Sequence, residues 1–146
     1  MRVYLDMCCL KRPFDDQTQP RIHLESEAVL ALLSAPADKL EFVRSAALSL
    51  ENDQNPLKHR AARVGRWLAQ LPLVDVPDDT LQARTAELIA LGFKNFDAFH
   101  LACAEFGGTE VFCTCDDRLL SLARRQASLL KVQVANPLEL VAEVFP

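Results

Sequence analysis

The sequence contains little glycine. Four of its 146 residues are glycines, namely Gly65, Gly92, Gly107 and Gly108. A phosphate-binding loop or a dinucleotide-binding fingerprint needs several glycines at fixed spacing, and these four do not supply one. The Gly-x-Ser-x-Gly motif of serine hydrolases is absent as well. These absences argue against a nucleotide-cradling loop and against serine-based acyl chemistry.

Long apolar runs and an excess of positive charge are also missing. No stretch approaches the roughly 18 consecutive apolar residues of a membrane helix, and Asp6 interrupts the apolar N-terminal run. We therefore expect no membrane span and no secretory signal, and a cytoplasmic protein. Sixteen Lys and Arg residues against 20 Asp and Glu residues give a net charge of −4. Binding of nucleic acid by bulk electrostatics is thus disfavoured, which leaves room for a local basic patch.

The cysteines do not form a recognisable framework. There are five of them, an odd number, lying within apolar runs without a Cys-x-x-Cys pair: Cys8, Cys9, Cys103, Cys113 and Cys115. We interpret them as reduced and mostly buried thiols. A zinc site that combines them with His23, His59 or His100 is not favoured, because no spacing places two ligands as such sites usually do.

Short β-rich runs alternate with helical patterns along the chain. The predicted strands are Arg2–Leu5, Leu40–Ala46, Leu73–Val76, Glu110–Cys115 and Val132–Val134. Between them, apolar residues recur at helical spacing in three segments, and the stretch Asp97–Phe106 is apolar almost all round, which predicts a central helix. Asn136-Pro137 is typical of the start of a last helix. The length and this alternation predict a single domain over residues 1–146, an α/β fold with a parallel sheet covered by helices on both faces.

Four acidic residues stand where ligands bind in such folds. Asp6 and Asp116 each end a predicted strand, and ligand crevices in open α/β sheets lie at the carboxyl ends of the strands. Glu51 follows the apolar-rich run that ends at Leu50, and Asp97 opens the central helix. We expect these four acids from separate segments to converge on one crevice.

Converging carboxylates repel one another and are pushed towards protonation unless a cation is present. Hard oxygen ligands favour Mg²⁺ or Mn²⁺ over zinc. The alternative for Asp97 and Asp116 is that they only cap or favour the dipole of their helices, and Glu51 alone is typical of a solvated helical residue. For Asp6 we expect neither a capping nor a surface role.

These residues resemble the PIN-domain nucleases, which include the VapC-type toxins of bacterial toxin–antitoxin pairs. Val-Tyr-Leu-Asp6 is similar to the opening strand with the first acid of that family, and the segment from Arg44 to Glu51 to the one that bears the second. Phe96-Asp97-Ala-Phe-His-Leu-Ala-Cys-Ala resembles the helix with the third acid, and Phe112-Cys-Thr-Cys-Asp116 the strand end with the fourth. The likeness runs from end to end of the chain. In the commonest toxin pattern an Asn comes two residues after the first acid, whereas this chain has Cys8.

The resemblance implies a three-layer α/β/α sandwich and metal-dependent cleavage of RNA. It implies that Asp6, Glu51, Asp97 and Asp116 are catalytic residues that bind Mg²⁺ or Mn²⁺, an RNA substrate, an antitoxin partner and a homodimer. Thr114 would orient a carboxylate or a water at the substrate site. We expect phosphate contacts from basic residues near the acids, namely Lys11, Arg12, Arg21 and Arg118. His100, one turn after Asp97, is interpreted as a core histidine in preference to a site residue.

Two other protein families and one other function were compared with the same residues. A haloacid dehalogenase phosphohydrolase also begins with an Asp after its first strand, but it needs a second Asp where this chain has Cys8. A receiver domain would carry its acid pair near the first strand, whereas Asp116-Asp117 follows a late one. A non-catalytic PIN-like module that binds RNA or a protein stays open as the alternative function.

Overall fold

A four-stranded parallel sheet runs through the centre of the molecule, whose computed structural model describes all residues from Met1 to Pro146. Its strands are β1 (Arg2–Leu5), β2 (Glu41–Phe42), β3 (Val111–Cys113) and β4 (Gln133–Ala135), in the order β2-β1-β3-β4. Val3 pairs with Phe42 on one side and with Val111 on the other, and every pairing is parallel. Strand β1 is therefore central, with β3 beside it.

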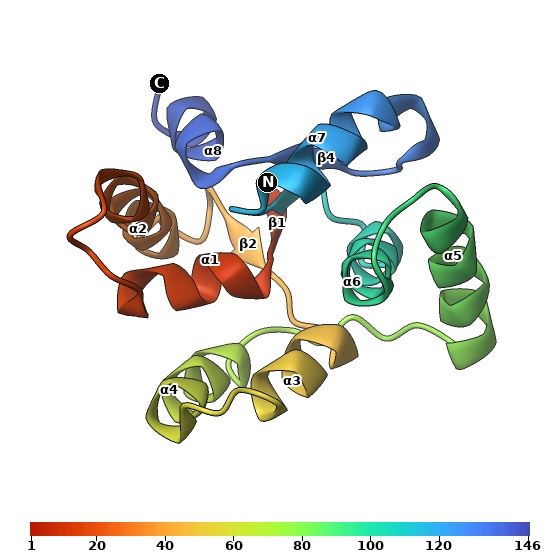
Figure 1. Cartoon of the computed structure of the whole chain (residues 1–146), viewed down its shortest axis with the longest axis horizontal. Helices are drawn as coiled ribbons and strands as arrows, with labels where there is room; N and C mark the ends of the chain where they lie inside the picture. Colours follow the sequence, from red (N-terminus) through yellow and green to blue (C-terminus); the bar gives the residue numbers. More distant parts are fainter.

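Helices surround this sheet. They are α1 (Met7–Lys11), α2 (Pro20–Leu33), α3 (Ala46–Asp53), α4 (Lys58–Leu68), α5 (Asp78–Ala90), α6 (Asn95–Phe106), α7 (Asp117–Arg125) and α8 (Pro137–Val144), with short 3-10 turns at Arg12–Phe14 and Ala127–Leu129. Helix α2 packs against α8 and α5 against α6, and the two pairs lie on opposite sides of the strands (Figure 1). The expected three-layer α/β/α sandwich around a parallel sheet is confirmed. None of the helices combines the length and the apolar character that a bilayer crossing requires.

The core forms where β1 and β3 lie between the helical layers. Both strands are buried almost throughout, as expected for parallel strands covered on both faces. The rings of Tyr4 and Phe112 stack in the middle of the sheet with centroids 5.2 Å apart. Helix α6 packs against this core with a nearly continuous buried stretch from Leu101 to Ala104.

Two predicted strands differ from the structure. The run Leu40–Ala46 contributes only Glu41–Phe42, because Ser45 caps α3 by accepting a hydrogen bond from the Leu48 N–H at 3.2 Å. The run Leu73–Val76 is not a strand of the sheet; a single bridge joins Leu73 to Arg44. Prolines at positions 72 and 77 flank that run and cannot donate ladder hydrogen bonds.

The remaining elements agree with the sequence patterns to within a few residues. Helix α6 covers the predicted Asp97–Phe106, and α8 begins at Pro137 after a capping box between Asn136 and Glu139. Strand β4 lies one residue later than predicted, at Gln133–Ala135. The strands β1 and β3 thus end side by side, each followed by one of the acids discussed above.

Candidate functional site

Asp6 and Asp116 follow adjacent strands and are tied together by one hydroxyl group. The Asp6 N–H donates to the Cys113 carbonyl at 2.9 Å, which continues the pairing of β1 with β3. The Thr114 hydroxyl donates to Asp6 Oδ2 at 2.9 Å and accepts a hydrogen bond from the Asp116 N–H at 3.1 Å. Thr114 is fully buried, so this single side chain fixes the two acids relative to each other.

Asp6 is a buried carboxylate with several donors. It is 6% exposed, and its Oδ1 accepts a hydrogen bond from the Met7 N–H at 2.8 Å. Asp6 therefore caps α1, and our expectation that it has no capping role is wrong. The Cys8 thiol donates to Oδ2 at 3.4 Å. Burial raises the pKa of Asp6 well above its usual value. Cys8 and, less strongly, Glu51 add to this effect, and His100 and Thr114 oppose it.

Packing of α3 against α6 brings Glu51 to the site through a chain of hydrogen bonds. Glu51 Oε1 lies 3.0 Å from His100 Nε2, and His100 Nδ1 lies 2.7 Å from the Tyr4 hydroxyl. Tyr4 also contacts the Ser45 hydroxyl at 2.5 Å. Ligand atoms of Asp6, Glu51 and His100 all lie within 4.8 Å of one another.

His100 is thus both the core histidine that we expected and a contact of the site. It is 1% exposed. Burial lowers the pKa of His100, but the hydrogen bond to Glu51 and the charge of Asp6 outweigh this effect and raise it overall. Sequence reasoning missed the Tyr4–His100–Glu51 chain. The available signal was position: Tyr4 stands two residues before Asp6, and His100 three residues after Asp97.

Asp97 and Asp116 line an open cavity of about 440 Å³ together with Lys94 and Arg118. Burial raises the pKa of Asp97, as do the charges of Asp116 and Glu51. Asp116 caps α7, because its Oδ1 accepts hydrogen bonds from the N–H groups of Arg118 and Leu119 at 2.9 and 3.1 Å. No side chain caps α6, so Asp97 is not a cap, but it stands in the first turn of that helix, where the dipole alternative stays open.

The acids lie in two neighbouring pairs, Asp6 with Glu51 beside His100 and Asp97 with Asp116 at the cavity. The charge of Glu51 also acts on Asp97, and several of the carboxylate oxygens are free. Asp97 accepts no hydrogen bond from the protein, Glu51 is held through one oxygen, and Asp116 through Oδ1 alone. Hard oxygen donors with free lone pairs, two of which have a pKa raised by burial and by neighbouring charge, fit a Mg²⁺ or Mn²⁺ ion. The donor chemistry of these residues is therefore compatible with a divalent cation.

Three of the four predicted basic residues divide into two groups, and the fourth, Lys11, neither forms an ion pair nor lines the cavity. Arg12 pairs with Asp15 at 3.2 Å and with Glu25 at 3.3 Å, and Arg21 bridges Glu25 and Asp117. These guanidinium groups are occupied by internal ion pairs. Arg118, in contrast, is exposed and lines the cavity beside the acids, and Lys94 and Arg125 lie on the same cavity wall without having been predicted.

The cysteines are free thiols, as expected, but three of them are brought together. The sulfur atoms of Cys8, Cys9 and Cys115 all lie within 4.8 Å of one another. Sequence spacing did not reveal this group, because Cys115 is contributed by a loop far along the chain.

Comparison with known proteins gives a family and a fold. Residues 3–125 match the family model described as PIN domain. Similar solved structures are FitAcB from Neisseria gonorrhoeae (20% identity, TM-score 0.53, covering 93% of this chain and 98% of that one) and VapBC-1 from nontypeable Haemophilus influenzae (11% identity, TM-score 0.59, covering 94% and 99%). VapBC2 from Rickettsia felis, bound to a DNA fragment from their promoter, is 13% identical with a TM-score of 0.58 and covers 93% and 98%. A search of curated protein sequences gives no match.

Proposed function

This chain belongs to the PIN domain family, and we propose on that basis that it is a metal-dependent endoribonuclease. It hydrolyses RNA phosphodiester bonds with Asp6, Glu51, Asp97 and Asp116 as the residues that bind Mg²⁺ or Mn²⁺. The observation that carries the proposal is the group of four acids from four separate segments. Two of them line an open cavity with basic residues, and Asp97 has no other partner in the protein.

The chemistry follows from the residues around that cavity. A divalent cation, when bound, lowers the pKa of a coordinated water and neutralises charge on the phosphoryl oxygens during an in-line displacement. Asp6 is oriented by the Met7 N–H and by Thr114, and Glu51 by His100. No covalent protein nucleophile is needed. Arg118 and Lys94 supply positive charge where RNA phosphates would enter.

The partners of this activity are proposed from the structural neighbours. VapBC-1, VapBC2 and FitAcB are toxin–antitoxin complexes, which supports an antitoxin partner for this chain. A homodimer is supported by exposed leucines on several helices, among them Leu24, Leu30 and Leu138. An enzyme that cleaves cellular RNA would work in the cytoplasm.

The alternative is a PIN-like module that keeps the fold but binds RNA or a protein without cutting it. The two functions differ in one assay. Purified protein should cleave a labelled RNA in the presence of Mg²⁺ or Mn²⁺ and not in EDTA. RNA that is retained by the protein and stays intact with either ion would favour the binding module.

Variants identify the residues responsible. Asp6→Asn, Asp97→Asn and Asp116→Asn should each abolish cleavage, because each removes a charged ligand. Asp38→Asn and Asp53→Asn are matched controls at exposed positions outside the cavity and should do little. Equal losses for Asp38→Asn and Asp97→Asn would refute the assignment of the site.

A further inference from the structure

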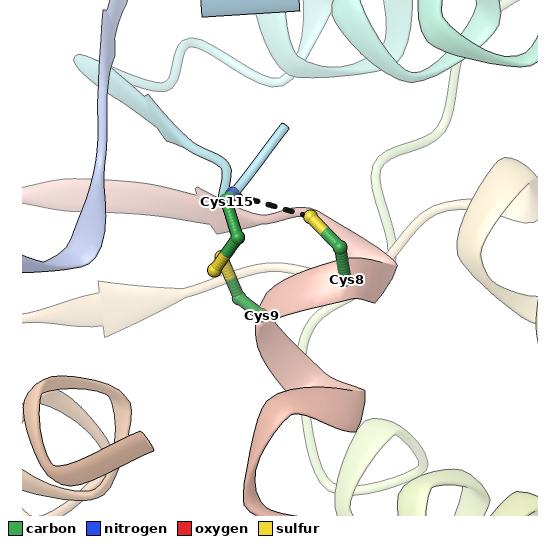
Figure 2. Close-up of side chains that lie close together, drawn as sticks. All are labelled: Cys8, Cys9 and Cys115. Atoms are coloured by element: carbon green, nitrogen blue, oxygen red, sulfur yellow. Dashed lines mark hydrogen bonds between the residues drawn. The ribbon is translucent and has the colours of Figure 1, made fainter. Parts of the chain in front are cut away.

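Cys8, Cys9 and Cys115 form a compact group of sulfur atoms beside the acids. Figure 2 shows Cys8 and Cys9 on α1 and Cys115 on the loop after β3, with the sulfurs of Cys9 and Cys115 next to each other. Those two sulfurs are 3.7 Å apart. Adjacent residues on a helix point in directions about 100° apart, which lets Cys8 and Cys9 approach Cys115 from two sides.

The spacing of the sulfurs is that of a thiolate metal site. Zinc–sulfur bonds of about 2.3 Å in tetrahedral geometry place two sulfur ligands about 3.8 Å apart. The Cys9–Cys115 separation of 3.7 Å already has this value. All three sulfurs lie within 4.8 Å of one another, so a shift of roughly 1 Å would complete the set.

One sulfur of the group already accepts a hydrogen bond from the backbone. The Cys115 N–H donates to Cys8 Sγ at 3.2 Å, drawn as the dashed line in Figure 2. Hydrogen bonds of this kind support thiolate ligands. Cys9 and Cys115 are buried, whereas Cys8 is partly exposed and offers an entry path.

We propose that Cys8, Cys9 and Cys115 bind a thiophilic d¹⁰ cation of the Zn²⁺ type at a second site, whose Cys8 thiol borders Asp6. Three metal–sulfur bonds form as three thiol protons are released to solvent, and a fourth position is left for water. Soft sulfur selects zinc-type ions, whereas the neighbouring carboxylates select Mg²⁺ or Mn²⁺, so the two sites differ in the metal they take. This binding does not depend on nuclease activity.

X-ray absorption spectroscopy of the wild-type chain loaded with one equivalent of Zn²⁺, under a thiol-free reductant, tests the proposal without any variant. Three sulfur ligands at about 2.3 Å are expected. A shell of oxygen and nitrogen alone would overturn the proposal, because Zn²⁺ would then occupy the carboxylates and His100.

Substituted Co²⁺ adds a test of the individual residues, since sulfur ligation gives thiolate-to-metal charge-transfer absorption. Cys9→Ser and Cys115→Ser should each lose most of this absorption. Cys103→Ser changes a buried cysteine outside the group and should retain it, as should Asp97→Asn, which changes only the carboxylates. Absorption that survives in Cys9→Ser and Cys115→Ser, or its absence from wild type, would refute the site.

Discussion

Replacing Asp97 by Asn should raise the stability of the metal-free protein while it abolishes activity. The side chain has no hydrogen bond to lose, because it caps no backbone N–H of α6. Its burial and the charges of Asp116 and Glu51 raise its pKa, which means that the folded protein disfavours its ionised form. An uncharged amide of nearly the same size removes that repulsion. A pure dipole role for Asp97 predicts the opposite, a loss of up to about 1 kcal/mol.

Magnesium should reverse the order of the two proteins. At ten times its dissociation constant, a cation that binds only the folded state stabilises it by about 1.4 kcal/mol. For a chain of this length that corresponds to an increase of roughly 3 to 6 °C in melting temperature. Wild type should gain this amount, and Asp97→Asn clearly less, because one ligand is missing.

Thermal melts of wild type, Asp97→Asn and the exposed control Asp53→Asn, each in EDTA and in Mg²⁺, measure both effects. Asp53→Asn should follow wild type in both conditions. A variant Asp97→Asn that melts below wild type in EDTA and gains as much from Mg²⁺ would return Asp97 to a dipole role. The nuclease proposal would weaken with it.

Three further predictions follow from the same geometry. Thr114→Val should cost about 1 to 3 kcal/mol in denaturant unfolding and impair cleavage, because Asp6 loses a buried donor, whereas Thr114→Ser should retain both. The folded protein holds the protons of Asp6 and Asp97 more tightly than the unfolded chain, since burial raises their pKa values, so the unfolding free energy in EDTA should fall as pH rises from about 4 to 6; a flat profile would contradict this. Light scattering at tens of micromolar should give the mass of a dimer, and a monomer would count against the proposed self-association.

The sequence predicts the strands and the positions of the acids best where a segment's local pattern favours the same structure that its place in the fold requires. Strand β1 is apolar from Val3 to Leu5 and is followed directly by Asp6, and no competing helix signal overlaps it. The predicted strand Leu40–Ala46 is shortened because Ser45 is a favourable helix N-cap, and α3 begins directly after it. Leu73–Val76 does not form a strand, because prolines flank it on both sides and only the single bridge from Leu73 to Arg44 joins it to the chain next to β2.

The contacts between the acids could not be predicted in the same way. The bond from His100 to Glu51 joins two helices whose packing no local pattern specifies. The cysteine group has the same origin, since Cys115 meets α1 only after β3 has paired with β1. Residue types and strand ends predict which side chains approach the site, and tertiary packing decides which hydrogen bonds they make.

The hydrogen bonds divide the acids into two kinds, and this division bears on how the site would work. Asp6 and Asp116 follow strands and are fixed by backbone N–H groups and by Thr114 before any ion arrives. Asp97, on α6, has no such restraint. Fixed ligands lower the reorganisation that binding requires, whereas a free ligand must be ordered by the ion itself. A bound cation should therefore restrict the side chain of Asp97 most and that of Asp6 least.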